Sequence, residues 1–350
     1  MVVRSVTRTV RGLLRRRFGS ALRFTQLTNL TLLTLAALHG ESLQPAALAR
    51  RLQTQTTFRH NEKRVHRFAG NPRLPINTIC DRLLGMILTL SPRGKLVPLT
   101  IVDETDLPGG CEGLVAAIPH QGRALPFAFS IFHYDRMPSG QKVIERGFFN
   151  FVACLLRFYR LEPLFLLDRG YADIKHILYF TEELHAHFVI RVPNSVYVSL
   201  PGYAGRLAKL GRIGQWEAIS YHRTKPARLN LAVFQGKDRY GNEELVYLVT
   251  DLPADEAQER YRLRMRIEED FRDLKTTLGL KHLRPRKDVE QRVARLLLVA
   301  MVTACVTAYL YPRALAEQTR VVKRHSDVSF VRLVVMVYRL RWSCYVSGAG

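Results

Sequence analysis

A charged stretch from Ala254 to Leu280, ADEAQERYRLRMRIEEDFRDLKTTLGL, constrains the fold more than any other part of the sequence. It contains no proline, and its single glycine lies next to its end, where a helix would stop. Asp255 can cap the first turn, and Gln258 follows three residues later to complete a capping box. The sequence therefore predicts one continuous helix over this range.

Four polar side chains of this predicted helix fall on one side: Tyr261, Arg264, Glu268 and Lys275. At about 100° per residue they lie within a sector of roughly 60°. A hydroxyl, a guanidinium, a carboxylate and an ammonium in a row suit a nucleic-acid strand held beside a metal ion. Taken alone, such a helix is more often a solvated face with weak ion pairs, and we expect the neighbouring Glu269 to be solvated or ion-paired.

Two aspartates upstream follow β-rich runs. Asp103 ends the run Leu96–Asp103 (LVPLTIVD), with Thr105 just beyond, and Asp168 follows the apolar residues of EPLFLLDRGYAD. One aspartate in such a position is usually a turn or helix cap, but here the pattern occurs twice. Neighbouring parallel strands would bring the two carboxylates together at one edge of a sheet. Two close carboxylates repel each other and favour a divalent cation with oxygen ligands, Mg²⁺ or Mn²⁺.

The charge of the chain indicates its class of partner. Lys and Arg number 53 against 30 Asp and Glu, which gives a net charge of +23 over 350 residues. Such an excess favours nucleic acid or another anionic surface, because cation–phosphate attraction with counterion release drives that binding. The five cysteines are scattered without a Cys-x-x-Cys pair, which argues against a zinc module or disulfide framework and fits a reducing cytoplasm.

The N-terminal third is predicted to be helical. Residues 1–24 form a basic arm, for which DNA contact and a disordered tail are equal alternatives. An apolar helix from Gln26 to His39 should end at Gly40, and Ser42 should open a second helix with Pro45 in its first turn. A basic segment from Phe58 to Leu74 follows. Short helices with a basic last member resemble a helix-turn-helix unit, and a plain helical bundle is the alternative.

The middle of the chain is predicted to alternate between strands and a helix. Apolar patterns predict a strand over Ala124–Tyr134, a helix over Gln141–Arg160 and a strand over His187–Val192. From Ser195 to Asp251 the pattern is strand and turn, with strands at YVSL, EAISYH, RLNLAVF and LVYLVTD and a hairpin signal at Asp238–Asn242. This block interrupts the α/β alternation and indicates an insertion.

Two apolar segments close the chain. Leu296–Tyr311 is shorter than the roughly 20 residues of a membrane span, so we expect a core helix and no membrane. Ser329–Trp342 is amphipathic and basic, and contact with DNA or with a second subunit are both open for it.

The chain resembles a DDE transposase of the insertion-sequence-four family. That family has a Tyr-x2-Arg-x3-Glu-x6-Lys signature, which the four residues of the charged helix match without a gap. Val102-Asp103-x-Thr105 and Leu167-Asp168-Arg169-Gly170 resemble its two aspartate motifs. The resemblance spans roughly Leu27 to Tyr311. The chain is compact for this family, so we expect its accessory N- or C-terminal parts to be reduced.

The resemblance implies an α/β fold, an RNase H-like catalytic core with a β-rich insertion before the glutamate helix, preceded by a small helical N-terminal domain. The ranges that follow are a basic arm (1–24), a helical DNA-binding domain (25–92), the first part of the core (93–194), the insertion (195–252), the rest of the core with the glutamate helix (253–311) and a basic C-terminal segment (312–350).

The resemblance also implies a function. Asp103, Asp168 and Glu268 would be the catalytic carboxylates and hold Mg²⁺ or Mn²⁺, two ions in all, for DNA cleavage and strand transfer. It assigns DNA contacts near the cleaved end to Tyr261, Arg264 and Lys275. The expected partners are the inverted-repeat ends of the element, target DNA and a second copy of the chain in a synaptic homodimer, in the bacterial cytoplasm at the nucleoid.

Two alternatives to transposition remain open on the sequence. One is a metal-dependent nuclease of RNase H-like fold that cuts without transferring strands. The other is a catalytically silent DNA-binding regulator derived from a transposase. Retention of all three acidic positions argues against the silent regulator, and the Tyr/Arg/Lys set argues for transposition over simple cleavage.

Overall fold

A computed structural model describes residues 2–40, 42–90, 99–137, 140–237, 240–284, 288–318 and 329–346. The chain divides into two compact units. Unit 1 contains Met1–Leu96, Glu104–Phe148 and Ile267–Gly350, and unit 2 contains Val97–Asp103 and Phe149–Arg266. The six functional ranges expected from the resemblance remain a prediction, because the two units are defined by their internal packing and carry no information on function.

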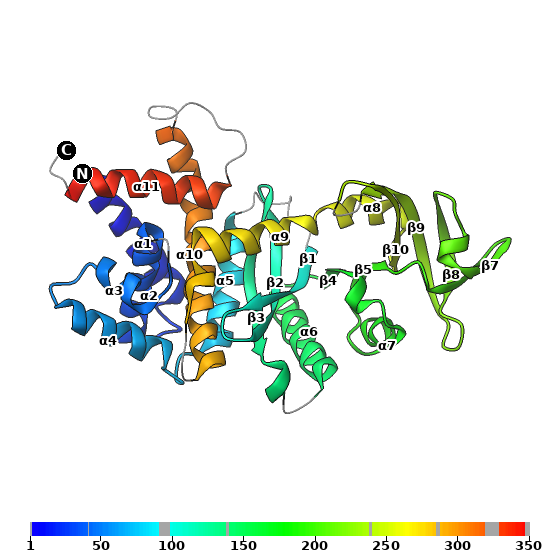
Figure 1. Ribbon diagram of the computed structural model, residues 1–350, viewed down its shortest axis with the longest axis horizontal. Helices are drawn as coiled ribbons and strands as arrows, with labels where there is room; N and C mark the ends of the chain where they lie inside the picture. The colour runs from blue at the N-terminus through cyan, green and yellow to red at the C-terminus, as the bar shows by residue number, and fades with distance from the viewer. Residues whose placement is uncertain are drawn as a thin grey trace. The chain divides into compact units, whose positions relative to one another are not determined.

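Unit 1 begins with five helices (Figure 1): α1 (Val2–Phe18), α2 (Phe24–His39), α3 (Pro45–Arg51), α4 (Phe58–Ala69) and α5 (Ile76–Leu90). The disordered-tail alternative is wrong for the N-terminal segment, since α1 buries Val10, Leu14 and Phe18 completely. Gly40 caps α2 as predicted. The cap of α3 is Gln44 and not Ser42; the Ser42 hydroxyl instead accepts a hydrogen bond from the Gln44 N–H at 3.1 Å.

Within the described residues, ten strands form one sheet in the order β3-β2-β1-β4-β5-β10-β9-β8-β6-β7. Unit 1 holds β2 (Cys111–His120) and β3 (Arg123–Phe132), which pair antiparallel. Strand β1 (Leu99–Leu107) begins in unit 2 and ends in unit 1. The prediction that the first strand ends at Asp103 is wrong, because β1 runs on through Asp103 and Thr105; residues 96–98 of that predicted run lie outside the described residues.

Unit 2 carries the remaining strands: β4 (Leu164–Leu167), β5 (His187–Val192), β6 (Tyr197–Leu200), β7 (Tyr203–Arg206), β8 (Gly214–Tyr221), β9 (Ala227–Lys237) and β10 (Glu243–Thr250). Strands β1, β4 and β5 run parallel, and β10 adds to β5 in the antiparallel sense. The predicted insertion strands therefore extend this sheet beyond β5. Strands β9 and β10 pair as the predicted hairpin, although residues 238–239 of its loop lie outside the described residues.

The helix between the two parallel strands is α6 (Gln141–Phe158), and short helices follow β4: η2 (Arg169–Tyr171), α7 (Ile174–Leu178) and the π-helix η3 (Tyr179–Glu183). In unit 2 the ring of Phe149 packs edge-on against Phe165, Tyr171 and Phe180, at centroid distances of 5.2, 5.5 and 4.9 Å. This aromatic cluster stabilises the packing of α6 against β4, because edge-to-face ring pairs contribute free energy beyond that of the area they bury.

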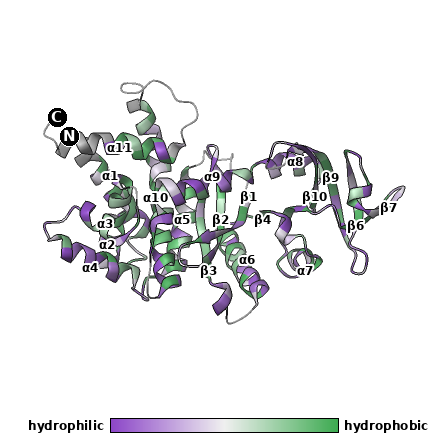
Figure 2. Cartoon of the chain, viewed as in Figure 1, coloured by the Kyte–Doolittle hydropathy of each residue, from purple (hydrophilic) through white to green (hydrophobic). Residues whose placement is uncertain are grey.

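The C-terminal part of unit 1 is built on α10 (Val289–Gln318), which packs against α2, α5 and α11 (Phe330–Val346). By length and composition alone, Val289–Ala316 could cross a membrane, but 94% of its apolar window is buried inside the protein. The core-helix prediction for Leu296–Tyr311 is thus confirmed. Helix α11 buries Val331, Val334 and Tyr338 against its neighbours, so its apolar side is occupied within the chain. Figure 2 shows α4, by contrast, as largely hydrophilic.

The prediction of one continuous helix over Ala254–Leu280 is wrong. The segment forms α8 (Ala254–Arg262), α9 (Met265–Arg272), the π-helix η5 (Asp273–Thr277) and the short η6 (Leu280–His282). Between α8 and α9 the N–H groups of Leu263, Arg264 and Arg266 each donate to the carbonyl three residues earlier, at 2.9–3.1 Å. Such bonds wind the chain more tightly than an α-helix, and π turns wind it less tightly. The predicted common face is therefore not maintained along the segment.

The predicted capping box is also wrong. Pro253 occupies the N-cap of α8 without a side-chain cap, and Asp255 lies inside the first turn. In place of a local cap, the Ala254 N–H donates to Glu217 Oε1 of β8 at 2.9 Å. A carboxylate at a helix N-terminus satisfies an orphan donor and complements the helix dipole, so a tertiary contact replaces the local cap.

The aromatic cluster of unit 2 gives a stability prediction. Phe149 is fully buried, whereas Phe158 on the same helix is 74% exposed. We expect Phe149→Ala to lower the free energy of unfolding by about 3–5 kcal/mol, because it removes ring contacts and leaves a cavity. Phe158→Ala should change it by less than about 0.5 kcal/mol. Urea unfolding monitored by circular dichroism compares the two, and equal losses would contradict the packing described.

Candidate active site

The two predicted aspartates lie at matching positions on neighbouring strands. Strands β1 and β4 are parallel, and Ile101 pairs with Leu166. Asp103 and Asp168 each come two residues later, so both carboxylates lie at the same level of the sheet. Asp103 is buried within β1, while Asp168 directly follows β4 and accepts a hydrogen bond from Gly170 N–H at 2.8 Å. The predicted convergence of these two aspartates is confirmed within unit 2.

Arg264 connects the two carboxylates. Its Nη2 lies 2.9 Å from Asp103 Oδ2 and 3.8 Å from Asp168 Oδ2. The side chains of Arg264 and Asp103 are only 10% and 13% exposed, whereas that of Asp168 is 40% exposed. The tightened turn between α8 and α9 places Arg264 here. A buried guanidinium between two carboxylates offsets their mutual repulsion at close range.

Tyr261 belongs to the same neighbourhood. The pKa of its hydroxyl is raised to about 12. Burial is the largest cause, the charges of Arg264 and Arg191 oppose the shift, and the carboxylates of Asp168 and Asp103 contribute to it. The phenol is therefore neutral near pH 7, and a neutral phenol can donate a hydrogen bond to an anionic oxygen. Of the four residues of the charged segment, Tyr261 and Arg264 thus lie in unit 2 beside the aspartates.

The other two residues of the charged segment lie in unit 1. Glu268 is exposed on α9, and its predicted role as third carboxylate stays a prediction. Lys275 lies in η5 and lines a cavity of about 370 Å³ together with Glu104, Thr105, Asp106, Glu112 and Tyr134. The signature lysine therefore faces an acidic cavity at the end of the β1–β2 hairpin.

The acidic cavity perturbs one of its own carboxyls. The pKa of Glu112 is raised to about 7, chiefly by burial and in part by the carboxylates of Asp106 and Glu104, while the charge of Lys275 opposes the shift. Tyr134 donates a short hydrogen bond to Glu104, and Gln141 Nε2 donates to the same carboxylate at 3.3 Å. Lys275 is thus the cation that this cluster of carboxyls holds nearby.

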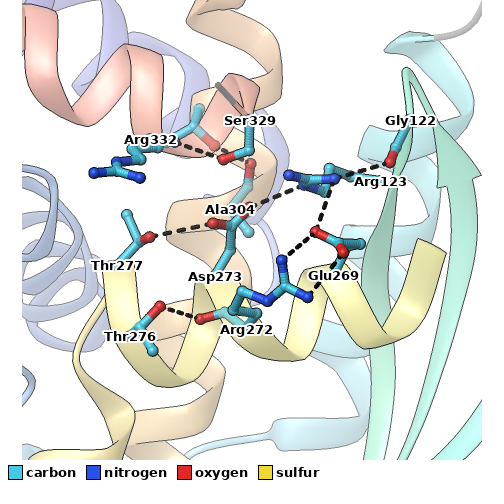
Figure 3. Close-up of polar contacts among 11 residues, drawn as sticks. Gly122, Arg123, Glu269, Arg272, Asp273, Thr276, Thr277, Ala304, Ser329 and Arg332 are labelled. Atoms are coloured by element: carbon cyan, nitrogen blue, oxygen red, sulfur yellow. Dashed lines mark hydrogen bonds and ion pairs between the residues drawn. The ribbon is translucent and has the colours of Figure 1, made fainter. Parts of the chain in front are cut away.

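Arg123 of β3 anchors the segment that carries Glu268 and Lys275 (Figure 3). Its guanidinium lies 3.2 Å from Glu269 Oε2 and 3.2 Å from Asp273 Oδ2. Arg272 also pairs with Glu269, and Thr277 donates to Asp273 at 3.1 Å. The expectation that Glu269 is solvated or ion-paired is confirmed, because it pairs with two arginines. Because Glu269 and Asp273 are four residues apart, one arginine fixes a whole turn of α9 and η5.

The chemistry of the donor set suits a hard divalent cation. Asp103 and Asp168 direct carboxylate oxygens at one cation, here the guanidinium of Arg264, and Mg²⁺ and Mn²⁺ prefer such oxygens. Across the described part of the chain, no three or more His, Cys, Asp or Glu side chains gather as a group that could hold a metal ion. The two aspartates therefore fit such an ion, and a third ligand from the chain remains a prediction.

Sequence reasoning missed several of these residues. Arg123 and the acidic cavity residues Glu104, Asp106 and Glu112 were not singled out. The only local signal was the alternation of Glu104 and Asp106 along β1, on the opposite face from Asp103. No local signal connects Arg123 with Glu269 and Asp273, which are about 150 residues away.

The contact of Arg264 with Asp103 gives a second stability prediction. We expect Arg264→Ala to lower the free energy of unfolding by about 3 kcal/mol, because a nearly buried carboxylate loses its cation. Asp103→Asn in the Arg264→Ala background should recover part of the loss. Arg260→Ala is the control, since Arg260 pairs with the more exposed Glu256 and should cost less than about 1 kcal/mol. Urea titration measures all four proteins, and equal losses for the two arginine variants would contradict the assigned contact.

Comparison with known proteins supports a nucleic-acid enzyme. Residues 150–304 match the family model described as the transposase DDE domain. The match includes Asp168 and the segment with Tyr261, Arg264, Glu268 and Lys275, and it begins after Asp103. No curated protein matches the chain. The matched segment, together with the paired aspartates, supports a DDE transposase.

Proposed function

We propose that the protein is a transposase that binds the ends of an insertion sequence and catalyses metal-dependent DNA cleavage and strand transfer into target DNA. The observation that carries the proposal is the pairing of β1 with β4, which sets Asp103 and Asp168 at one level with Arg264 between them. The family match over residues 150–304 supports the same reaction class. The Tyr-Arg-Glu-Lys spacing supports placement in the insertion-sequence-four family.

The proposed core is RNase H-like. In support of this, the order β3-β2-β1-β4-β5 combines an antiparallel pair, β2 and β3, with three parallel strands. The first aspartate lies on the first of these strands, and the second follows the next parallel one. Strands β6 to β10 stand as the insertion before the segment that contains Glu268. Helices α2 to α5 would form the N-terminal DNA-binding domain, for which the hydrophilic α4 is the candidate contact.

Asp103, Asp168 and Glu268 would hold the metal ions, proposed to be two Mg²⁺ or Mn²⁺. Bound there, the ions would polarise the scissile phosphate and activate the attacking water or 3′-hydroxyl. The residues of the chain do the positioning. Arg264 offsets the aspartates' repulsion, and Tyr261, as a neutral phenol, can donate to a phosphate oxygen. Arg123 holds the turn from Glu269 to Asp273, next to Glu268.

The proposed partners are the inverted-repeat ends of the element and target DNA, with a homodimer in the synaptic complex. The net charge of +23 supports polyanion binding. Tyr261, Arg264 and Lys275 are proposed to contact DNA near the cleaved end. We place the protein in the bacterial cytoplasm, at the nucleoid and off the membrane, in keeping with the buried α10.

A nuclease that cuts without strand transfer is the second candidate, and a catalytically silent regulator is the third. A strand-transfer assay separates the first two: a labelled 3′-hydroxyl end should join to a plasmid in the transposase and remain free in the nuclease. The acidic residues at all three positions support an active enzyme over the regulator.

The three carboxylates give the central activity prediction. Asp103→Ala, Asp168→Ala and Glu268→Ala should each abolish cleavage in Mg²⁺ and leave DNA affinity nearly unchanged, because the basic surface supplies most of the affinity. Glu269→Ala should have little effect on cleavage, since Asp273 still pairs with Arg123. The assay is cleavage of a duplex that carries the repeats flanking the gene. Near-normal cleavage by any one alanine variant would remove that residue from the site.

Lys275 tests whether the charged segment contacts DNA. If it grips a phosphate, Lys275→Ala should lower the salt slope of log K by about one unit and slow single-turnover cleavage. Lys281 is the control, because it is exposed in η6 and lies past Gly279, which adopts a left-handed conformation with φ of 73°. Lys281→Ala should have a milder effect. If both the salt slope and the cleavage rate of Lys275→Ala are unchanged, Lys275 does not contact DNA and serves only as a structural cation in the acidic cavity.

A further inference from the structure

The insertion strands of unit 2 carry an unusual excess of positive charge. Residues 197–237 contain a single carboxylate, Glu217, against seven cations: Arg206, Lys209, Arg212, Arg223, Lys225, Arg228 and Lys237. Glu217 is already used, because its Oε1 accepts the Ala254 N–H at the start of α8. The cations of this region therefore have little local neutralisation.

Strand register assembles some of these cations on one face. Tyr197 of β6 pairs with Arg206 of β7, and directly paired residues share a face of the sheet. Ser199 lies two residues after Tyr197, hence on the same face. Ser199 pairs with Ser220 of β8, and Ser220 pairs with Arg228 of β9. One face of four strands thus presents two arginines, two hydroxyls and a phenol.

A third arginine joins this face from the turn after β8. The Cζ atom of Arg223 lies 5.9 Å from the ring centroid of Tyr197, within cation–π range. We call the set of Tyr197, Ser199, Arg206, Ser220, Arg223 and Arg228 the Arg–Ser face. The opposite face is apolar and occupied: Val198, Tyr221 and Leu229 are at most 2% exposed, and Tyr221 donates to the Ala172 carbonyl at 2.7 Å.

The three arginines of the Arg–Ser face are exposed, and the described part of the chain places no counter-charge beside them. Arg206, Arg223 and Arg228 are all solvent-exposed, and within the described residues none of them lies within 4.0 Å of a carboxylate oxygen. Core packing does not explain them, and like charges gathered on one face repel each other. Arginine forks and serine hydroxyls are the donors with which proteins hold phosphate oxygens.

We propose that the Arg–Ser face binds the phosphate backbone of DNA. This inference rests on the proposed function for its choice of polyanion, and it adds a DNA contact that the acidic site and the charged segment do not provide. Serine hydroxyls beside arginines favour a phosphodiester strand over an anionic lipid surface, because the strand offers a row of oxygens for directional hydrogen bonds. Among the described residues, this face also carries no large exposed apolar side chain that could enter a bilayer.

The test compares two triple variants of the full chain that lose the same charge. The first is Arg206→Gln, Arg223→Gln and Arg228→Gln. The control is Arg160→Gln, Lys175→Gln and Lys237→Gln, three exposed cations of unit 2 outside the Arg–Ser face. Binding to a 40-base-pair duplex of arbitrary sequence is measured by fluorescence anisotropy at several salt concentrations, without divalent metal. Thermal unfolding checks that each variant is folded.

We expect the first variant to lower the salt slope of log K by about 2–3 units, roughly 0.9 for each phosphate that the protein no longer neutralises, and the control to change it by less than about one unit. Arg→Lys at the same three positions should keep most of the slope, because the charge is conserved. Equal slopes for the first variant and the control would overturn the proposal. So would a loss of binding to phosphatidylserine vesicles with DNA binding unchanged.

Failure of this inference can be told from failure of the proposed function. If wild-type protein binds DNA through the Arg–Ser face but does not cleave the repeat-bearing duplex in Mg²⁺, the transposase proposal fails and the binding face stands. If cleavage depends on Asp103 and Asp168 but the salt slope does not change when the three arginines are replaced, the proposed DNA contact of the Arg–Ser face is wrong and the transposase proposal is retained.

Discussion

The parallel pairing of β1 with β4 is the constraint on which the candidate site depends. Two separate segments, about 65 residues apart, become chemically related because Ile101 and Leu166 pair and each strand carries its aspartate two residues later. The cost of placing two carboxylates so close is offset by Arg264, which comes from a third segment. The sheet, the aromatic cluster behind it and the turn between α8 and α9 all serve to hold this arrangement.

Much of this arrangement could be predicted from local patterns. The apolar run before Asp168, the strand His187–Val192 and the strand YVSL agree with β4, β5 and β6, because buried strands have a composition that helices rarely share. The buried character of Leu296–Tyr311 followed from its length and apolarity. The convergence of Asp103 with Asp168 was predictable because each follows an apolar run, and neighbouring parallel strands bring such positions together; that Asp103 lies within β1 and not at its end was not predictable.

The remaining features depend on tertiary contacts that local patterns do not encode. The charged segment has helical propensity throughout, yet its backbone is wound more tightly at Leu263–Arg264, where Arg264 is buried against Asp103. It is wound less tightly from Asp273 on, where Arg123 pairs with Asp273. Glu217 replaces a local cap for α8. The Arg–Ser face emerges only from strand register, because its members are scattered over more than 30 residues.

If Asp168 is a metal ligand at the reacting phosphate, replacing its carboxylate should change which metal ion supports cleavage. Asp168→Cys replaces a hard oxygen ligand by a soft sulfur, which binds Mg²⁺ poorly and Mn²⁺ better. Cleavage of the repeat-bearing duplex is measured in each metal. We expect Asp168→Cys to lose cleavage in Mg²⁺ and to regain a substantial part of it in Mn²⁺, relative to wild type. Cleavage in Mg²⁺ at the wild-type rate would contradict it.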